Sequence, residues 1–466
     1  MNATTMPKIS SAPVAVRHVV KGRTIASADL EFGPPNARFT TPALDLGTLI
    51  WRRDEVPPLA AVLVDEIIDI LVAAGDYLRR DPEGEVARTA ALSAATSPHP
   101  RDLVERAYAT LGLMFNRSSM EFMLAQELGG KDVVDGWREV ARPSGKPARI
   151  RAFPPRLIHI IAGNSPGVAA QTVIRGALVK GVHLMKLPSN ELFSAALILE
   201  ALAKVAPGHA IARSFSAVYW RGGDEQVERR LFRPQYFDKL VAWGGEATIR
   251  SAVKYLGPGF ELVSFDPKTS ISFIGKEAFQ SEAVLDQVAE AAADDATLMN
   301  QQACTSSRFQ FIEGSEAEVD RYCAKLQARL GLERRTASAT PIPLPNALRD
   351  EIGGLRDLPD FYRVWGGYDG AGVVIRSEEP VEFYPDGKVV NVVRVQALKD
   401  AVRFATVATS TVGVYPPERK ADLRDALAAQ GTQRIVALGG AGPEVGLPHD
   451  GFYPLQRFVR WVNDEG

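Results

Sequence analysis

The sequence predicts an α/β fold in which one part of the chain forms a doubly wound parallel sheet. Between residues 153 and 275, five short apolar runs alternate with helical patterns, and turns rich in Gly, Pro, Ser and Asn separate them. Strands that are apolar on both faces are typical of parallel sheets covered by helices on both sides. A similar alternation follows residue 300, and a length of 466 residues allows two or three domains. We therefore expect two α/β domains.

The N-terminal part is less regular. Residues 1–55 contain short apolar stretches broken by Pro and Gly, whereas residues 59–128 carry apolar side chains at helical spacing. The Gly- and Pro-rich residues 129–155 end in short extended segments. The five strands predicted after them are residues 157–162, residues 182–187, a run that ends at Arg221, residues 239–243 and a run that ends at Phe265.

The second α/β part is predicted to begin with a long helix over residues 281–299. Its further elements are a strand at 308–313, a helix at 317–330, a loop at 335–345, strands at 373–375, 389–395 and 405–414, a helix at 418–429 and a strand at 434–438. The tail from residue 439 has no regular pattern. We therefore place the domain boundaries so that the chain divides into residues 1–275, 276–438 and 439–466.

Composition excludes several classes of protein. The 54 basic and 56 acidic residues give a net charge of −2 and a pI near 6.4, which does not suit binding to nucleic acid. Two cysteines cannot form a disulfide framework, so a reducing, cytoplasmic setting is expected. No apolar run is long enough to span a membrane, and the N-terminus lacks the apolar core of a signal peptide.

The two cysteines have different surroundings. Cys323 lies on the apolar face of the helix at 317–330 and is expected to be a small buried hydrophobe. Cys304 lies between a helix and a strand, among small polar residues that allow a ligand to approach, and Arg308 could favour its thiolate. From the residues alone, Cys304 is either a nucleophile or an ordinary loop cysteine.

Two predicted strand ends carry polar residues that suit ligand binding. The turn at residues 162–167 joins a strand to a helix, where backbone N–H groups can face a ligand and the Asn164 amide can bind an oxyanion. The alternative is an Asn that only suits the turn. Lys186 ends the next strand, at the sheet edge where nucleotides bind, unless it is a solvated lysine.

The remaining candidates are weaker. His159 and His183 lie inside apolar strands and are expected in the core, and no histidine or cysteine spacing indicates a metal site. A cysteine hydrolase would need a distant histidine, for which His449 is the candidate. Glu261, in the fifth strand, is either a base or structural. Three methionines within ten residues either line a flexible acyl site or belong to a core helix, namely Met114, Met120 and Met123.

Taken together, several segments resemble the aldehyde dehydrogenase superfamily, in the order in which that superfamily has them. They are IIAGNSPGVAAQTVIRGALVKGVHLMKLPSN, VAWGGEATIR, FELVSFDPKTSISFIG and NQQACTSS. Within the superfamily the chain is most similar to the fatty acyl-CoA reductases of bacterial bioluminescence, through AWGG, QQACTSS and the tail GLPHDGFYPLQRFVRWV. The likeness runs from about Pro143 to the C-terminus. It implies a cofactor-binding domain within residues 1–275 and a catalytic domain at residues 276–438.

The resemblance implies roles for particular residues. Cys304 matches the nucleophile, and Asn164 matches the asparagine that stabilises the oxyanion. Lys186 matches the lysine that contacts the adenosine ribose of the cofactor. Ser189 stands where members that prefer NAD have a glutamate, so the expected cofactor is NADPH, although Glu191 lies nearby. Removing that carboxylate removes its repulsion of a 2′-phosphate.

Further cofactor contacts and the general base are implied less directly. Ser165, in the Asn turn, is expected to contact the cofactor. The Gly-Ser of the superfamily's pyrophosphate turn appears here as Gly245-Glu246. Alignment on Glu-Leu places the base at Glu261, whereas alignment on the downstream lysine places Ser264 there. A reductase needs no base to activate water, so both alignments stay open.

The function expected from this resemblance is NADPH-dependent reduction of a fatty acyl thioester, acyl-CoA or a related activated acyl group, to an aldehyde through acyl-Cys304. The alternatives are an aldehyde dehydrogenase that works in the oxidative direction, a cysteine acyltransferase or thioesterase without redox chemistry, and a non-catalytic partner subunit. An acyl-protein ligase is a candidate partner. A hairpin-like segment near residues 140–152 and the tail resemble oligomerisation elements, which implies a homo-oligomer.

Overall fold

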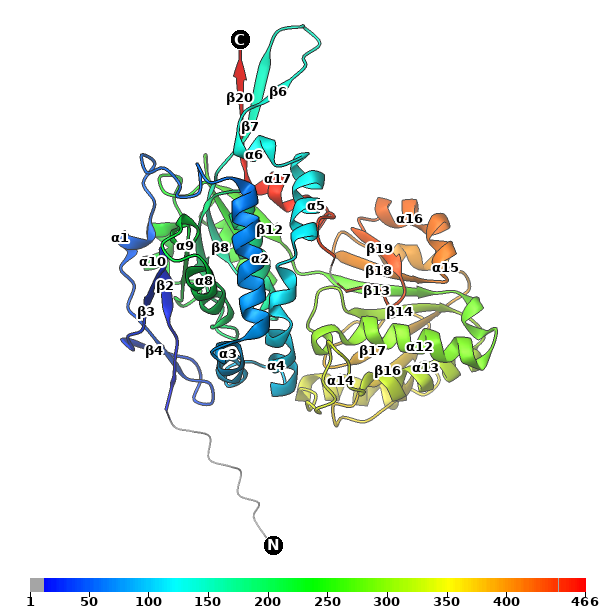
Figure 1. The fold of residues 1–466 in the computed structure, drawn as a ribbon. Helices are drawn as coiled ribbons and strands as arrows, with labels where there is room; N and C mark the ends of the chain where they lie inside the picture. The colour runs from blue at the N-terminus through cyan, green and yellow to red at the C-terminus, as the bar shows by residue number, and fades with distance from the viewer. Residues whose placement is uncertain (1–11, 443) are drawn as a thin grey trace. The chain divides into compact units, whose positions relative to one another are not determined.

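The structure is a computed structural model that describes residues 12–442 and 444–466. The chain forms two compact units, each with its own seven-stranded sheet (Figure 1). Unit 1 extends to Phe265 and resumes at Tyr453–Gly466, whereas unit 2 is continuous from Asp266 to Phe452. None of the helices in the described part of the chain is long and apolar enough to cross a membrane.

The sheet of unit 1 has the strand order β12-β11-β8-β9-β10-β2-β3. The strands from β8 to β12 pair in parallel, and β2 and β3 extend the sheet in the antiparallel sense. Every residue of β8 is buried, as expected for a strand covered on both faces. The five predicted strands are therefore confirmed. The bounds are β2 (His18–Val20), β3 (Arg23–Ile25), β8 (Arg156–Ile160), β9 (Val182–Lys186), β10 (Phe215–Val218), β11 (Lys239–Trp243) and β12 (Glu261–Phe265).

Helices cover both faces of this sheet. Helices α7 and α8 are almost wholly buried, whereas α2 is amphipathic, with acidic residues in its first turn and arginines in its last, the charge order that the helix dipole favours. The bounds are α1 (Leu46–Leu49), α2 (Val64–Arg80), α3 (Glu85–Ala94), α4 (Arg101–Ala109), η1 (Leu111–Met114), α5 (Arg117–Leu128), α6 (Asp132–Asp135), α7 (Gly167–Leu178), α8 (Ser194–Val205), α9 (Ala210–Arg213), α10 (Glu225–Leu231), α11 (Glu246–Val253) and α17 (Pro454–Phe458).

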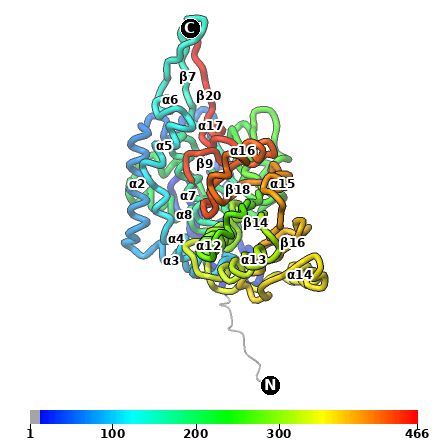
Figure 2. Tube along the Cα trace, turned by 90° about the vertical axis from the view of Figure 1, so that its right-hand side faces the viewer, coloured from blue at the N-terminus to red at the C-terminus, as the bar shows by residue number. Residues whose placement is uncertain are grey.

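Unit 1 also contains two small sheets. One joins β1 (Val14–Ala15), β5 (Phe39–Thr41) and β4 (Leu30–Phe32). The other joins β20 (Arg460–Glu465), β7 (Ala148–Phe153) and β6 (Arg138–Val140), and both views show it extending away from the rest of unit 1 (Figures 1 and 2). The hairpin expected near residues 140–152 is therefore present, and β20 completes its sheet.

The sheet of unit 2 has the strand order β15-β16-β17-β14-β13-β18-β19, and all pairs except β15 with β16 are parallel. The strand bounds are β13 (Thr269–Ile274), β14 (Ser307–Glu313), β15 (Arg363–Trp365), β16 (Val373–Ser377), β17 (Val389–Val395), β18 (Thr409–Tyr415) and β19 (Arg434–Ala437). The helix bounds are η2 (Lys276–Phe279), α12 (Glu282–Thr297), η3 (Leu298–Gln301), α13 (Glu316–Leu330), α14 (Asn346–Arg356), α15 (Leu398–Ala401), η4 (Val402–Phe404), η5 (Pro417–Arg419) and α16 (Lys420–Ala429).

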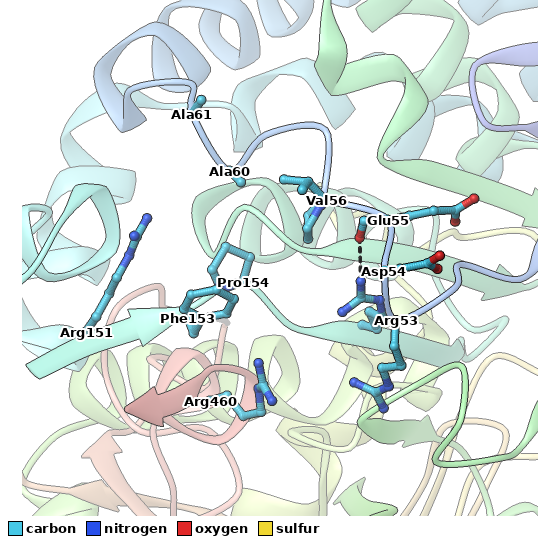
Figure 3. Close-up of a pocket in the computed structure, with 12 residues that line it drawn as sticks. Arg53, Asp54, Glu55, Val56, Ala60, Ala61, Arg151, Phe153, Pro154 and Arg460 are labelled. Carbon is cyan, nitrogen blue, oxygen red and sulfur yellow. Dashed lines mark hydrogen bonds between the residues drawn. The ribbon is translucent and has the colours of Figure 1, made fainter. Parts of the chain in front are cut away.

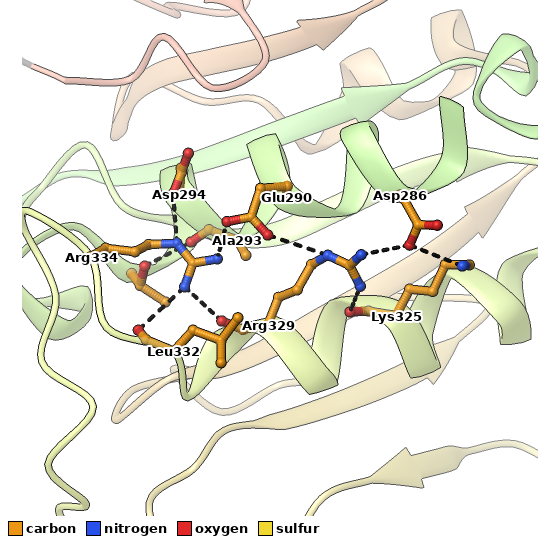
Figure 4. A network of polar contacts seen from close by, with 9 residues as sticks. Asp286, Glu290, Ala293, Asp294, Lys325, Arg329, Leu332 and Arg334 are labelled. Atoms are coloured by element: carbon orange, nitrogen blue, oxygen red, sulfur yellow. Dashed lines mark hydrogen bonds and ion pairs between the residues drawn. The ribbon is translucent and has the colours of Figure 1, made fainter. Parts of the chain in front are cut away.

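Helices α12 and α13 pack side by side, and ion pairs join them along the surface (Figure 4). Asp286 of α12 accepts hydrogen bonds from Lys325 at 2.9 Å and from Arg329 at 2.5 Å. One turn on, Glu290 pairs with Arg329 at 3.3 Å and with Arg334 at 2.7 Å. Each exposed pair contributes at most about 1 kcal/mol, so the buried apolar faces provide most of the stability. Cys323 lies in that core with no exposed surface, as predicted.

The structure differs from the expected domain division at both ends of unit 2. Residues 266–275 belong to unit 2, because β13 is a central strand of its sheet. Residues 439–452 also belong to unit 2, and only residues 453–466 return to unit 1, as α17 and β20 rather than an irregular tail. Periodicity missed β13 because its six residues follow β12 after only three others, so the two strands looked like one segment.

A buried carboxyl group fixes the start of α17 in unit 1. Glu127 of α5 is 1% exposed, and its Oε2 accepts a hydrogen bond of 2.5 Å from the Leu455 N–H. Burial raises the pKa of Glu127 to about 7, although that hydrogen bond and the charge of Arg175 oppose the shift. In the unfolded chain a glutamate has a pKa near 4.3.

We therefore expect the stability of unit 1 to depend on pH. The folded state binds the Glu127 proton more tightly than the unfolded state, so this contribution is fully present below about pH 4.3 and is lost as the pH rises through about 7. Glu127→Gln should keep the acceptor for Leu455 and remove the titration. Relative to wild type, its free energy of unfolding should rise by roughly 2–4 kcal/mol between pH 5 and 8 in denaturant titrations. If the difference in free energy of unfolding between Glu127→Gln and wild type is the same at pH 5 and pH 8, the pH dependence does not come from Glu127.

Candidate active site

The segment before Cys304 has an unusual backbone. Met299, Asn300 and Gln301 all have positive φ, at 50°, 51° and 72°, although none is glycine. A left-handed conformation in such residues costs about 1–3 kcal/mol each and persists only where the surroundings enforce it. Strain of this kind is concentrated at functional sites, and here it directly precedes the Cys304 turn.

Buried hydrogen bonds hold this strained segment. The Gln301 side chain pairs with the Val389 backbone in both directions, donating to its carbonyl at 2.8 Å and accepting from its N–H at 3.1 Å. Asn300 Oδ1 accepts from the Ser338 N–H at 2.8 Å. Arg308 is almost fully buried and donates to the carbonyls of Gln301 and Pro385. Arg308 therefore supports the backbone of the loop.

The position of Cys304 itself is fixed from the neighbouring strand. Ser270 of β13 donates through Oγ to the Cys304 carbonyl at 2.8 Å and accepts from the Thr411 N–H at 3.1 Å. The Ser306 N–H donates to the Ala303 carbonyl at 3.1 Å, which closes the turn. Cys304 is exposed at the surface of unit 2. Its side chain is thus accessible while its backbone is held.

The surroundings of Cys304 favour its neutral thiol. Loss of hydration within the packed protein is the main cause that raises its pKa to about 11, and the charge of Asp450 adds to it. The backbone N–H groups of Cys304 and Thr305 and the charge of Arg434 act in the opposite direction. Two N–H groups directed at the sulfur also form a natural site for negative charge on a reacting oxygen.

Arg434 and Asp450 were not recognised in the sequence. Arg434, at the start of β19, donates to the carbonyls of Gly440, Ala441 and Gly442 at 2.7–3.1 Å. Asp295 of α12 binds the N–H groups of the same loop, at Gly439 and Ala441. The neighbouring sequence gives no sign of the roles of Arg434 and Asp450, because more than a hundred residues separate them from Cys304.

In unit 1, the Asn164 turn follows the carboxyl end of β8, as predicted. His99 Nε2 lies 3.0 Å from the Asn164 carbonyl oxygen and fixes the turn from outside. Ser165 Oγ accepts from the Gly167 N–H at 3.1 Å, just before α7 begins. A Cβ on Gly163 would lie 1.8 Å from the Asn190 side chain, and only glycine allows this close approach. The turns after β8 and β9 therefore pack against each other.

Lys186 is the last residue of β9, and Ser189 and Arg221 follow β9 and β10 at the same edge of the sheet. Burial lowers the pKa of Lys186 to about 8, and its Nζ lies 5.7 Å from the centre of the Tyr219 ring. Arg221 is exposed, and its charge lowers the pKa of Tyr219 against the effect of burial. Ser189 is also exposed. Arg221 follows β10, so the rule that selected Lys186 would have selected it as well.

Glu191 does not reach this edge. It is 5% exposed, and it accepts a hydrogen bond of 2.5 Å from the Tyr108 hydroxyl and others from Ser194. Its carboxylate is thus occupied inside unit 1. Glu191 is therefore not available to a cofactor ribose, and the carboxylate whose charge acts on Lys186 is that of Glu228.

The turn after β11 is open. A Cβ on Gly245 would meet no atom within 4 Å, and Gly245 caps the start of α11. Glu246, the first residue of α11, pairs with Arg250 at 2.5 Å, and both side chains are exposed. An anion could approach this helix start, with the Glu246 charge drawn toward Arg250.

The structure does not support Glu261 as a general base. Glu261 is the first residue of β12, is mostly exposed and pairs with Lys239 at 3.2 Å, so it lies at the amino edge of the sheet. Asn164 follows the carboxyl end of β8, at the opposite edge. Ser264, the alternative, is the next-to-last residue of β12 and lies at the carboxyl edge. The two alignments differ by three residues, and in a strand of five residues that difference moves the predicted base from the amino edge to the carboxyl edge.

The methionines divide between core and surface. Met120 and Met123 are 1% exposed and belong to the core, which settles the choice for these two. Met114 instead lies close to the Asn turn, since a Cβ on Gly167 would be 3.3 Å from its sulfur. Leu113 and Phe122 beside it are 58% and 43% exposed. Both histidines of the strands are buried, and His159 Nε2 lies 2.9 Å from His183 Nδ1, as expected for core residues.

A family model described as acyl-CoA reductase (LuxC) matches residues 59–461, which is most of the chain. The chain belongs to the LuxC family of acyl-CoA reductases. A long-chain acyl-protein thioester reductase from Vibrio harveyi is 28% identical over 365 residues, covering 76% of this chain and 72% of the relative. A reductase with the same description from Photorhabdus laumondii is 29% identical over 372 residues, with the same coverage of both chains. The chain is therefore an oxidoreductase, an acyl reductase.

Solved structures establish the fold of this LuxC-family chain. The aldehyde dehydrogenase KauB from Pseudomonas aeruginosa superposes with a TM-score of 0.73 over 98% of both chains at 12% identity. An NADP-dependent glyceraldehyde-3-phosphate dehydrogenase from Bacillus halodurans superposes with a TM-score of 0.68 at 13% identity, over 98% of this chain and 96% of the other. The prediction of an aldehyde-dehydrogenase-like α/β fold is confirmed.

The charges around Cys304 make a testable prediction about its reactivity. In wild type, alkylation of Cys304 by iodoacetamide should rise about tenfold per pH unit until the pH approaches about 11, since the thiolate is the nucleophile. Asp450→Asn removes a negative charge and should speed alkylation at pH 8 by roughly threefold to tenfold, equivalent to a pKa lower by about half a unit to one unit.

Arg434→Met is the matched opposite change and should slow alkylation at the same pH. Cys323 is buried and should not react in the folded protein, so a Cys323→Ser background removes ambiguity in the mass spectrum. Slower alkylation of Asp450→Asn would contradict the electrostatic assignment and would identify Asp450 as a proton acceptor for the thiol.

Proposed function

We propose that the chain reduces a long-chain acyl thioester to the aldehyde with NADPH, through an acyl group carried on Cys304. The observation that carries the proposal is the Cys304 loop, in which a strained and firmly bonded backbone presents an accessible sulfur next to two N–H groups. The relatives are described as acyl-protein thioester reductases and the family as acyl-CoA reductases, so the donor thiol belongs to a protein or to CoA.

In the first half-reaction, the Cys304 thiol loses its proton and the resulting thiolate attacks the thioester carbonyl carbon. The N–H groups of Cys304 and Thr305 receive the negative charge that develops on the oxygen. One such donor lowers the barrier by about 3–4 kcal/mol in known enzymes. The bond to the donor sulfur then breaks, the donor leaves as a thiolate that takes up a proton, and the acyl group remains on Cys304.

In the second half-reaction the acyl carbon is reduced, and NADPH bound at the carboxyl edge of the unit 1 sheet would supply the hydride. The resulting oxyanion, held by the same donors, collapses as the bond to Cys304 breaks, which releases the aldehyde and restores the thiolate. Water must not compete for the acyl group during this interval. Ser264 at the carboxyl edge of β12 cannot act as a carboxylate base, and this favours reduction over hydrolysis.

The carboxyl edge of the unit 1 sheet fits a nicotinamide dinucleotide phosphate. Parallel strands end at this edge, where Lys186, Ser189 and Arg221 would hold the adenosine end and the open start of α11 would hold the pyrophosphate. Two cationic groups at this edge suit a 2′-phosphate, since Glu191 is occupied by Tyr108 and Ser194. The carboxylate whose charge acts on Lys186 is that of Glu228, which itself accepts hydrogen bonds from Trp220 and Tyr255. This arrangement favours NADPH over NADH.

Intact-mass spectrometry tests the covalent step. After incubation with a series of long-chain acyl-CoAs, we expect an acyl adduct on Cys304 that disappears with release of aldehyde when NADPH is added. Cys304→Ala should form no adduct, whereas Cys323→Ala should behave as wild type. Discharge as free acid without NADPH would contradict the proposal and indicate a thioesterase. An adduct from an S-acylated protein but not from acyl-CoA would identify a protein donor.

Steady-state kinetics test the cofactor. Arg221→Ala should lower kcat/KM for NADPH by roughly tenfold to a hundredfold, the range for losing a charge-assisted contact, and should change kcat/KM for NADH little. Ser189→Glu should lower the NADPH value further through repulsion of the 2′-phosphate. Arg229→Ala is a matched control, since Arg229 lies on exposed α10 and pairs with Glu225. Equal losses with both cofactors would exclude a role in 2′-phosphate recognition.

A further inference from the structure

A pocket of about 440 Å³ lies at the amino edge of the unit 1 sheet, remote from the proposed cofactor site (Figure 3). It is enclosed by residues 53–61, by the end of β7 and the start of β8, and by the start of β20. Arg156 lines it and is the first residue of β8, whereas Asn164 follows the last. At about 3.3 Å per residue, the length of β8 separates the two edges by roughly 13 Å.

The lining combines arginines with apolar side chains. The apolar part includes Phe153, Pro154, Ala60 and Val56, of which Val56 is 74% exposed. Four guanidinium groups line the same space, from Arg53, Arg151, Arg156 and Arg460. An apolar floor beside several cations is typical of a site for an anion with an apolar body.

Two of these arginines have structural partners. Arg53 donates to Asp238 Oδ1 at 2.5 Å, and the Arg156 backbone N–H donates to Oδ2 of the same carboxylate at 2.8 Å. The Arg156 side chain, 5% exposed, donates to the carbonyls of Arg52 and Glu55, while its Nε has no hydrogen-bond partner. These contacts fix the loop over the pocket and leave a buried guanidinium at its wall.

Among the described residues, Arg151 and Arg460 do not make structural contacts of this kind with a carboxylate. Arg460 lies opposite Phe153 in the register of β20 with β7, and Arg151 lies two residues before Phe153, so the three share one face of the small sheet. The guanidinium carbons lie 5.5 Å and 5.3 Å from the Phe153 ring centre. In the described part of the chain neither has an ion-pair partner, and Arg151 Nε is buried without a hydrogen bond. Arg149, next on that face, pairs with Glu139 at 3.1 Å.

The carboxylates around the pocket offset only part of this charge. Asp54 pairs with Arg52 at 3.0 Å, and Glu55 accepts from the Arg52 N–H at 2.8 Å. Burial is the main cause that lowers the pKa of Arg156; the charges of Arg53 and Arg460 lower it as well, whereas those of Asp238 and Glu55 oppose the shift. Like charges gathered on one face destabilise a sheet unless a counter-charge joins them.

We propose that this pocket binds a small amphiphilic anion whose carboxylate or phosphate head lies between Arg151 and Arg460 and whose apolar body covers Phe153 and Val56. The site is separate from Cys304 and from the cofactor edge, so the proposal does not rest on the proposed function. Guanidinium groups bind both head groups through paired hydrogen bonds, so an alkyl carboxylate and an alkyl phosphate are the two sources of this chemistry.

Isothermal titration of the full chain with four probes tests the proposal. Octanoate and octyl phosphate should bind saturably, inorganic phosphate should bind at least tenfold more weakly, and octanol should show no saturable binding. The ranking of octanoate against octyl phosphate identifies the preferred head group. Inorganic phosphate binding as tightly as the alkyl anions would overturn the amphiphilic assignment, and no saturable binding of either alkyl anion would overturn the site.

Variants locate the binding. Arg151→Gln and Arg460→Gln should each weaken binding of the better alkyl anion at least tenfold, whereas Arg149→Gln, on the same face but paired with Glu139, should leave it unchanged. Without ligand, the Tm of Arg151→Gln should equal or exceed that of wild type, because an unmatched like charge is removed. Unchanged affinity in Arg151→Gln and Arg460→Gln would place the ligand elsewhere, for instance at an acyl site, and would overturn the proposal.

Discussion

Parallel pairing of strands that are buried on both faces is the constraint on which unit 1 depends. It forces every strand to end at the same edge of the sheet, so the turns after β8, β9, β10 and β11 collect there whatever their sequences. Those turns carry the Asn164 amide, the Lys186 ammonium, the Arg221 guanidinium and the open helix start at Gly245. The pocket lined by Arg53, Arg151, Arg156 and Arg460 lies at the opposite, amino edge of the sheet, away from these turns.

In unit 2, the fold exposes the Cys304 sulfur while hydrogen bonds hold the backbone around Cys304 in place. Three left-handed residues bring the chain out of α12, and side chains from strand and loop segments far away in sequence hold them there. The neighbourhood of Cys304 balances opposing charges, with Asp450 against Arg434. A nucleophile in such a balance responds strongly to any ligand that changes its hydration or adds a charge beside it.

The local pattern of apolar residues was enough to predict the strands and the site residues that lie at strand ends. The runs of β8 and β9 were recognised because most of their residues are apolar. Asn164 and Lys186 were recognised because they lie at the carboxyl ends of those runs. Long-range partners were not recognisable. The charges of Arg434 and Asp450 act on Cys304 from more than a hundred residues away, and His99 contacts Asn164 across 65 residues. No periodicity in the sequence records such long-range relations. Helix α14 was missed because Gly353 and Gly354 lie within it. Glu261 was proposed as the base although it lies at the amino edge, because a motif match does not fix strand register.

The discontinuity of unit 1 has a consequence for how the protein is made. Strand β20 pairs with β7 along its whole length, so Ala148 meets Glu465 and the intervening chain forms a closed loop that contains all of unit 2. Contacts this distant in sequence form late, since loop closure must precede them. Unit 2 is continuous and can complete its sheet as soon as its own residues have left the ribosome. Until β20 has been synthesised, one edge of β7 in unit 1 has no strand paired with it. Exposed strand edges of this kind can bind chaperones or pair with strands of other chains during synthesis.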